Sequence, residues 1–145
     1  MSSITVVKRD GTREPFDANK INLALVKASE GLPDQISKVV EVASQLQLTL
    51  FDGITSEQLD EAVINTTLQN VKDDPDFDKI AARLLLKTIY KKVLGAYETP
   101  EDLKKLHQKE FPKYLKTAVE MGLLDPRMAD GKTFDIKKLA AALNP

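Results

Sequence analysis

The sequence predicts an α+β fold that is mostly α-helical, with a four-helix bundle capped by a small β-hairpin or three-stranded sheet and followed by additional helices. Asp10-Gly11 separates two short runs, Thr5–Lys8 and Thr12–Phe16, and supplies the positive φ angles of a tight hairpin turn. After Asp17, apolar residues recur at helical spacing. Residues that start and stop helices, namely capping Asp, Ser or Thr and closing Gly, then repeat along the chain.

Composition is that of an ordinary globular protein. The 145 residues are 42% hydrophobic and 30% charged, which fits one domain with room for an appendage. A net charge of -1 gives no overall attraction to nucleic acid or to an anionic membrane surface, so any phosphate recognition is local. No apolar run reaches the ~20 residues of a membrane span and the N-terminus lacks a signal-peptide pattern, so we expect a cytoplasmic protein.

Two residue types that often carry chemistry are scarce. The chain has no cysteine, which excludes disulfides, thiolate metal sites and thiol nucleophiles. Its single histidine, His107, leaves a zinc site or a Ser-His-Asp arrangement poorly supplied, and its polar helix favours a surface position. We therefore expect no catalytic residue and no metal held by protein ligands.

The first two helices follow the predicted hairpin. The first runs from its N-cap, Asp17, toward the closing Gly31, and the second covers about Gln35–Leu48. Beyond them, Leu50–Ile54 contains another Asp-Gly pair, which fits a turn into a third strand beside the hairpin. The predicted apolar faces are Ile21, Ala24, Leu25 and Ala28 for the first helix, and Ile36, Val39, Val40, Ala43 and Leu46 for the second.

Capping signals define the third and fourth helices. Thr55 or Ser56 with Gln58 forms a capping-box pattern for a helix that ends near Lys72. Asp74-Pro75 predicts the start of the next helix, which runs to Leu94. Their predicted buried stripes are Leu59, Ala62, Val63 and Thr66, and Phe77, Ile80, Ala81, Leu84, Leu85 and Thr88, with Gly95 as the final stop and Arg83 paired with an acidic neighbour.

A new capped start at Glu98 to Asp102 marks the predicted domain boundary, and the chain beyond it is more polar. We predict one helix over about Pro100–Glu110, a second over Pro112–Met121 with Gly122 behind it, and a last one that begins at Asp135. The sequence contains no internal repeat, low-complexity segment or long linker.

Three basic side chains, Lys8, Arg9 and Lys20, are predicted to converge near the start of the first helix. The unpaired backbone N–H groups and the helix dipole favour an anion there, which suggests a phosphate site. On spacing alone, a hairpin followed by a capped helix is more often scaffolding, so the same residues also fit a solvated surface.

From Ile4 to about Gly95, several short motifs occur in one order: V-x-K-R-D-G, the helix start D-x-x-K-I, E-G-L at 30–32, F-D-G-I at 51–54, and P-D-F followed by A-A-R-L. This order resembles the ATP-cone, the regulatory nucleotide-binding domain at the N-terminus of many ribonucleotide reductase large subunits. From Glu98 onward, including V-E-M-G at 119–122, the chain is similar to the helical segment that follows the cone in class I large subunits. The resemblance implies an ATP-cone domain at 1–96 and the helical start of the large-subunit region at 97–145.

The resemblance implies contacts to the nucleotide's phosphates and sugar. Lys8 and Arg9 match the basic pair after the first strand, with Lys8 on phosphate, and Glu14 matches the acidic position that meets the sugar. Arg9 also fits a surface ion pair of little energetic weight. The backbone from Glu14 to Lys20 would line the nucleotide, with Asn19 and Lys20 at the helix start and Ile21 against the base.

Three further positions come from the third and fourth helices. Ser56 stands where the family often has threonine, which keeps the hydroxyl. Asp60 matches an acidic position that accepts from the adenine amine, although some members have histidine there and Asp60 also fits a solvated face. Lys91 matches a second phosphate lysine, but a lysine at a helix C-terminus also stabilises the helix dipole.

The resemblance implies an allosteric domain that binds ATP as activator or dATP as inhibitor, with Mg²⁺ carried by the phosphates. The implied partners are the rest of the reductase large subunit, the small radical-carrying subunit or a second large subunit, with exposed faces of the first four helices making the contact. Because reduction in this family requires cysteines, the chain is expected to regulate rather than to catalyse.

Two alternatives remain open. An ATP-cone also occurs in a transcriptional repressor of reductase genes, but there it follows a cysteine-rich zinc ribbon, which this chain lacks. The other alternative is a helical interaction module that binds no nucleotide, with its basic residues on a solvated surface. Failure to bind any adenine nucleotide would favour the second alternative.

Overall fold

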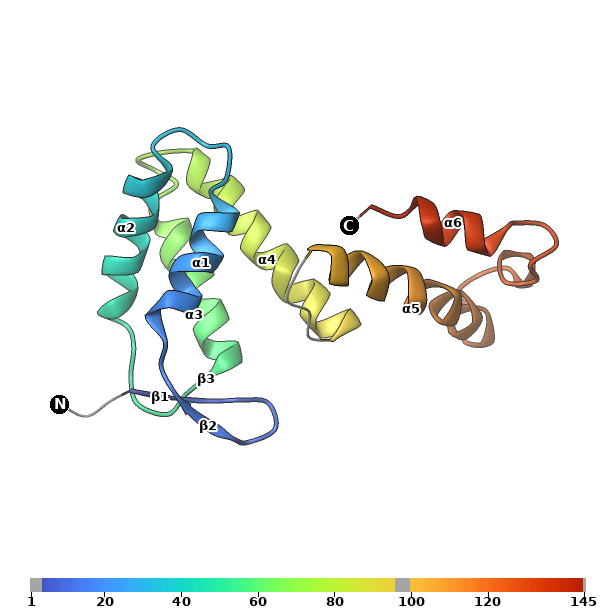
Figure 1. Ribbon diagram of the computed structural model, residues 1–145, viewed down its shortest axis with the longest axis horizontal. Helices are drawn as coiled ribbons and strands as arrows, with labels where there is room; N and C mark the ends of the chain where they lie inside the picture. The colour runs from blue at the N-terminus through green and yellow to red at the C-terminus, as the bar shows by residue number, and fades with distance from the viewer. Residues whose placement is uncertain (1–3, 96–99, 145) are drawn as a thin grey trace. The chain divides into compact units, whose positions relative to one another are not determined.

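The computed structural model describes residues 4–95 and 100–144 (Figure 1). These residues contain six α-helices and a three-stranded sheet, which confirms a mostly helical α+β fold. The chain divides into two compact units, Met1–Ile89 and Tyr90–Pro145, which are described separately. The predicted domain boundary begins at Glu98, which lies outside the described residues.

The sheet is built around its first strand. Strand β1 (Thr5–Val7) pairs antiparallel with β2 (Arg13–Pro15) and parallel with β3 (Ile54–Thr55), in the order β2-β1-β3. The predicted third strand is therefore present. Asp52 secures it, because its carboxylate accepts from the backbone N–H of Thr5 at 2.8 Å and from the Thr5 hydroxyl at 2.6 Å.

The hairpin turn is one residue longer than the two-residue turn predicted from Asp10-Gly11. The Lys8 N–H donates to the Thr12 carbonyl at 2.8 Å, and the Gly11 N–H donates to the Lys8 carbonyl at 2.9 Å. Gly11 has a φ of +84°, in the left-handed region, which is typical of a three-residue connection that ends in glycine. The carboxylate of Asp10 accepts from Thr12 and holds the loop closed.

Helices α1 (Ala18–Ala28) and α2 (Gln35–Gln47) follow the hairpin. Asp17 caps α1 as predicted, since its carboxylate accepts from the Asn19 N–H at 2.9 Å. The apolar face predicted for α2 is partly wrong: Ile36 is 81% exposed and Val40 57% exposed. Lys38 is buried among the core-facing residues instead, because acidic partners from elsewhere in the chain compensate its charge.

Helices α3 (Ser56–Gln69) and α4 (Asp76–Leu94) complete the first unit's helices. The predicted capping box of α3 is present, with Thr55 and Gln58 each accepting from the other's backbone N–H. The α4 stripe is confirmed except at Leu85, which is 49% exposed. The main core contains residues from all four helices, α1, α2, α3 and α4: Leu25, Ala28, Val42, Leu46, Val63, Phe77, Ile80 and Leu84. A smaller cluster of Val6, Ile54 and Leu59 packs the sheet against α3.

The second unit contains α5 (Pro100–Glu120), a 3-10 turn (Pro126–Met128) and α6 (Ile136–Ala142). Two helices were predicted where α5 is continuous. Pro112 removes one backbone donor, but helical hydrogen bonding resumes beyond it and the helix continues. Asp135 caps α6 as predicted. In the described parts of the chain, no helix combines the length and hydropathy needed to cross a lipid bilayer.

Candidate functional site

A cluster of charged side chains lies where the hairpin meets α1. The Glu14 carboxylate, on β2, contacts Lys8, the residue directly after β1, through Oε2 at 2.8 Å. Its other oxygen, Oε1, contacts Lys20 in the first turn of α1 at 3.3 Å. Residues from three consecutive elements therefore meet at one carboxylate, and two of the three predicted cations lie together there.

The ion pair between Lys8 and Glu14 favours the charged form of both side chains. The hydrogen bond and charge of Glu14 raise the pKa of Lys8, while Lys8 first and Lys20 second lower the pKa of Glu14. The Lys8 side chain is 47% exposed and the Lys20 side chain 65% exposed, against 33% for Glu14. Both ammonium groups are therefore within reach of a dissolved anion.

The remaining residues of this end of the site have simple local placements. Asn19 lies in the first turn of α1, where its backbone N–H is already bonded to the Asp17 cap. Arg9 is exposed in the hairpin turn, next to Lys8. The helix start adds its positive dipole end to the two lysines, so the region favours a negatively charged group.

A cleft lies between α1, α3 and α4, next along α1 from Lys20. It is small, with a cavity volume of about 30 Å³. Its walls are mostly apolar, with Asp60 as the acidic group and Lys87 as the basic group. Such a lining suits a flat apolar ring that carries a few polar atoms at its edge. The residues lining the cleft are Ile21, Ala24, Asp60, Val63, Ile64, Leu84, Lys87 and Thr88.

The family resemblance assigns Ile21 and Asp60 to the site, but the sequence does not identify Lys87 and Thr88 as cleft residues. The only available signal was helical spacing, because Lys87 and Thr88 follow the buried Leu84 by three and four residues on α4. That signal predicts a shared helix face but does not distinguish a packed core from an open cleft.

Ser56 and Lys91 complete the predicted set. Ser56 is the first residue of α3 and is half-buried, one helical turn before Asp60. Lys91 lies in the last turn of α4 and belongs to the second unit, so it is described apart from the cleft. Its role as a phosphate ligand stays a prediction.

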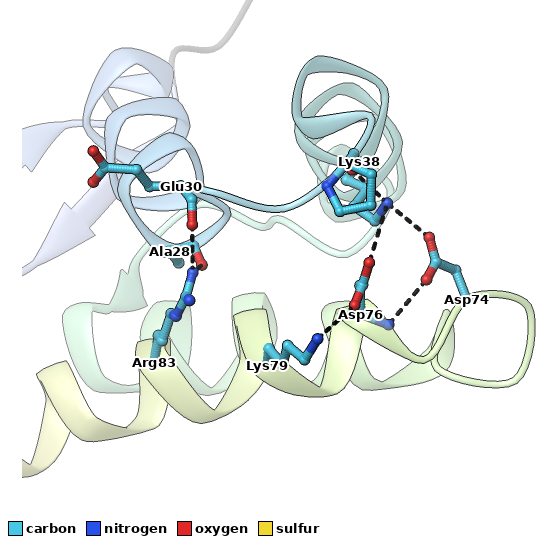
Figure 2. A network of polar contacts seen from close by, with 8 residues as sticks. Ala28, Glu30, Lys38, Asp74, Asp76, Lys79 and Arg83 are labelled. Atoms are coloured by element: carbon cyan, nitrogen blue, oxygen red, sulfur yellow. Dashed lines mark hydrogen bonds and ion pairs between the residues drawn. The ribbon is translucent and has the colours of Figure 1, made fainter.

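A separate polar network holds the first unit together away from this site (Figure 2). Arg83 of α4 donates to the carbonyl oxygens of Ala28 at 2.8 Å and Glu30 at 2.9 Å. The expectation that Arg83 pairs with an acidic side chain is wrong, because the carboxylate of Glu30 points away from it (Figure 2). Arg83 instead satisfies carbonyl groups at the C-terminal end of α1.

The second unit contains the single histidine of the chain. His107, expected at the surface, is half-buried, with its ring edge-on to Tyr90 at a centroid distance of 6.2 Å. Its Nδ1 atom is buried and has no hydrogen-bond partner in the described chain. Within residues 4–95 and 100–144, no group of three or more His, Cys, Asp or Glu side chains is arranged to hold a metal ion.

Comparison with known proteins gives a consistent family. The ATP cone domain matches residues 4–92. The chain is 34% identical to ribonucleoside-diphosphate reductase subunit alpha of Haemophilus influenzae over 112 residues, covering 74% of this chain and 15% of that protein. It is 34% identical to ribonucleoside-diphosphate reductase 1 subunit alpha of Escherichia coli over 99 residues, covering 68% and 13%.

A longer match extends into the second unit. The chain is 33% identical to ribonucleoside-diphosphate reductase subunit alpha of Helicobacter pylori over 147 residues, covering 98% of this chain and 16% of that protein. The chain thus spans less than a fifth of the length of these relatives.

Proposed function

This chain belongs to the ATP-cone family of domains, and from that premise we propose that it binds ATP or dATP as an allosteric effector of ribonucleoside-diphosphate reduction. One observation carries the proposal. Lys20 and Ile21 are consecutive residues of α1, yet Lys20 joins the charged cluster and Ile21 lines the cleft. A ligand with a polyanionic end and an apolar ring would engage both, and a nucleoside triphosphate has this form.

We assign the phosphate end of the nucleotide to the charged cluster. Lys8 and Lys20 supply ammonium groups, and Arg9 adds a guanidinium that matches phosphate geometry. Asn19 contributes from the first turn of α1, where the helix dipole favours an anion. Mg²⁺ would arrive with the phosphates, and Lys91 is proposed as a further phosphate ligand on the strength of the family resemblance.

We assign the adenine ring to the cleft and the sugar to the space beside Glu14. The carboxylate of Asp60 can accept from the exocyclic amine of adenine, whereas guanine places a carbonyl oxygen at that position and would be repelled. Thr88, also in the cleft wall, has a hydroxyl that can donate to a ring nitrogen. Ser56 offers a second hydroxyl one turn before Asp60, and Ile21 packs against the ring.

ATP is proposed as the activator and dATP as the inhibitor, acting through quaternary structure. Such a switch requires two states that the nucleotides bind with different affinity, since equal affinity shifts no equilibrium. The proposed contact surface is the exposed faces of α1 to α4, and the proposed partners are the small radical-carrying subunit or a second large subunit. The chemistry itself is assigned to the rest of a full-length large subunit, because this chain has no cysteine.

Calorimetric titration of this chain with ATP, dATP and GTP in the presence of Mg²⁺ tests the proposal, with light scattering on the same samples. We expect saturable binding of both adenine nucleotides, no comparable binding of GTP, and an increase in mass with dATP alone. Binding of neither adenine nucleotide would contradict the proposal and favour a helical interaction module. Binding of both without any mass change would place the oligomer contacts outside this chain.

A further inference from the structure

Glu14 holds the position between the two lysines that a phosphate group would take. Its Oε2 lies 2.8 Å from the Lys8 Nζ and its Oε1 lies 3.3 Å from the Lys20 Nζ, so each carboxylate oxygen serves one ammonium group. We call this arrangement the Glu14 bridge. A carboxylate and a phosphate accept from an ammonium group in the same way, and they cannot share one position because their charges repel.

We infer that Glu14 is a built-in competitor for the phosphate site, and that the anion which displaces it is a polyphosphate rather than a single phosphate. The inference rests on the proposed function, because it takes Lys8 and Lys20 as the phosphate ligands. Binding of the ligand would break the Glu14 bridge and replace it with contacts from the two lysines to phosphate. The free energy needed to break the bridge lowers the net affinity for the ligand.

The relative exposure of the three side chains indicates which groups move. The lysine side chains are 47% and 65% exposed, whereas Glu14 is 33% exposed and is fixed to the sheet by its pairing opposite Val6. The lysines can therefore turn toward a ligand while the carboxylate stays close to β1. The Glu14 carboxylate would repel the phosphates of the ligand, but it could accept hydrogen bonds from neutral donors such as the hydroxyl groups of a sugar.

The preference for polyphosphate follows from where the two lysines originate. Lys8 follows β1 and Lys20 lies in α1, so the bridge links the hairpin to the helix. A single phosphate that contacts both lysines must lie directly against the Glu14 carboxylate, which stays close to β1. A chain of phosphates can offer each lysine a different group and keep its charge further from Glu14, which reduces the repulsion.

Inorganic tripolyphosphate isolates this competition, because it lacks the sugar and base that Glu14 and the cleft would contact. We would titrate the chain with tripolyphosphate and with orthophosphate at low ionic strength, for the wild type, Glu14→Gln and Asp10→Asn. Asp10→Asn is the matched control: it removes one negative charge from the same hairpin, while its carboxylate accepts from Thr12 and forms no ion pair with the lysines in the described structure.

We expect Glu14→Gln to tighten tripolyphosphate binding by about threefold to tenfold and Asp10→Asn by less than about twofold, since exposed ion pairs are individually weak. We also expect wild-type protein to bind tripolyphosphate more tightly than orthophosphate. Glu14→Ala should shift tripolyphosphate binding in the same direction as Glu14→Gln, and circular dichroism checks that both variants keep the helical fold.

Equal effects of Glu14→Gln and Asp10→Asn would overturn the inference. They would show that loss of any negative charge from the hairpin tightens binding, so that the ion pairs of Glu14 with the two lysines would have no specific role. Weaker binding by Glu14→Gln would overturn it as well. If wild-type protein binds ATP while Glu14→Gln gives no gain, only the inference fails. If wild-type protein binds neither ATP nor tripolyphosphate, the proposed function fails with it.

Discussion

The Nζ atom of Lys38 lies 2.8 Å from Oδ2 of Asp74, although the Lys38 side chain is only 5% exposed. The same ammonium group donates to the Pro33 carbonyl at 2.7 Å and lies 4.0 Å from Oδ2 of Asp76 (Figure 2). A buried cation is thus surrounded by acceptors from the loop before α2 and from the start of α4. This network joins α2 to α4 at one end of the first unit.

We expect Lys38→Ala to lower the melting temperature by roughly 6–12 °C. The substitution removes a buried ammonium group and leaves the Asp74 carboxylate without its ion-pair partner. Lys38→Met should lower it less, since the longer side chain keeps the packing of the lysine stem. Thermal unfolding followed by circular dichroism measures both. Lys79→Met is the control, because its 62% exposed side chain pairs with Asp76 at the surface and should shift the melting temperature little.

Asp74 should make the stability of the first unit depend on acid. Its hydrogen bond with Lys38 lowers its pKa, and such a carboxylate stabilises the fold above the unfolded pKa, with the contribution lost as pH falls through the folded pKa. We expect wild-type protein to be more stable than Asp74→Asn at about pH 7 and this difference to shrink below about pH 4. Urea unfolding across this pH range measures the difference, and Asp73→Asn, at the exposed neighbouring position, should follow the wild type throughout.

Lys8→Ala should weaken ATP and dATP binding alike, by roughly tenfold, because it removes the ammonium group that is proposed to contact phosphate in both nucleotides. Calorimetry with each nucleotide gives the two dissociation constants. Lys27→Ala is the matched control, since Lys27 is exposed in the last turn of the same helix that begins near Lys20. A loss confined to one nucleotide would contradict the assignment of Lys8 to phosphate.

Asp60→Asn should change the response to dATP more than it changes triphosphate binding as such, because Asp60 lines the cleft assigned to the base. The measurements are the ratio of the ATP and dATP dissociation constants and the mass change with dATP. Glu61→Gln, at the exposed neighbouring position on α3, should leave both unchanged. If Asp60→Asn and Lys8→Ala produced equal losses for both nucleotides, the role given to Asp60 would be wrong.

The elements that could be predicted are those set by neighbouring residues. Asp17 caps α1, and Thr55 with Gln58 caps α3, through contacts that span two or three residues, so a local pattern contains both partners. The buried position of Lys38 could not be predicted in this way. Its partner Asp74 is 36 residues away, and an apolar periodicity gives no weight to a compensated cation.

The same distinction applies to the candidate site. Lys8 and Lys20 could be grouped from the sequence because a short hairpin and a helix start bring them close along the chain. Lys87 could not be assigned to the cleft, since that cleft exists only where α4 packs beside α1 and α3. The bridging role of Glu14 was also missed, because the family resemblance assigned it to the sugar alone.

Thr55 is both the last residue of β3 and the N-cap of α3, so no loop separates the sheet from the helix. Because β3 is paired to β1, a displacement of the hairpin cannot be absorbed by slack in the chain and is delivered directly to the start of α3. The hairpin is therefore coupled to α3 through β3 and the capping box at Thr55. A shift of the hairpin would therefore reach the helix that carries Ser56 and Asp60.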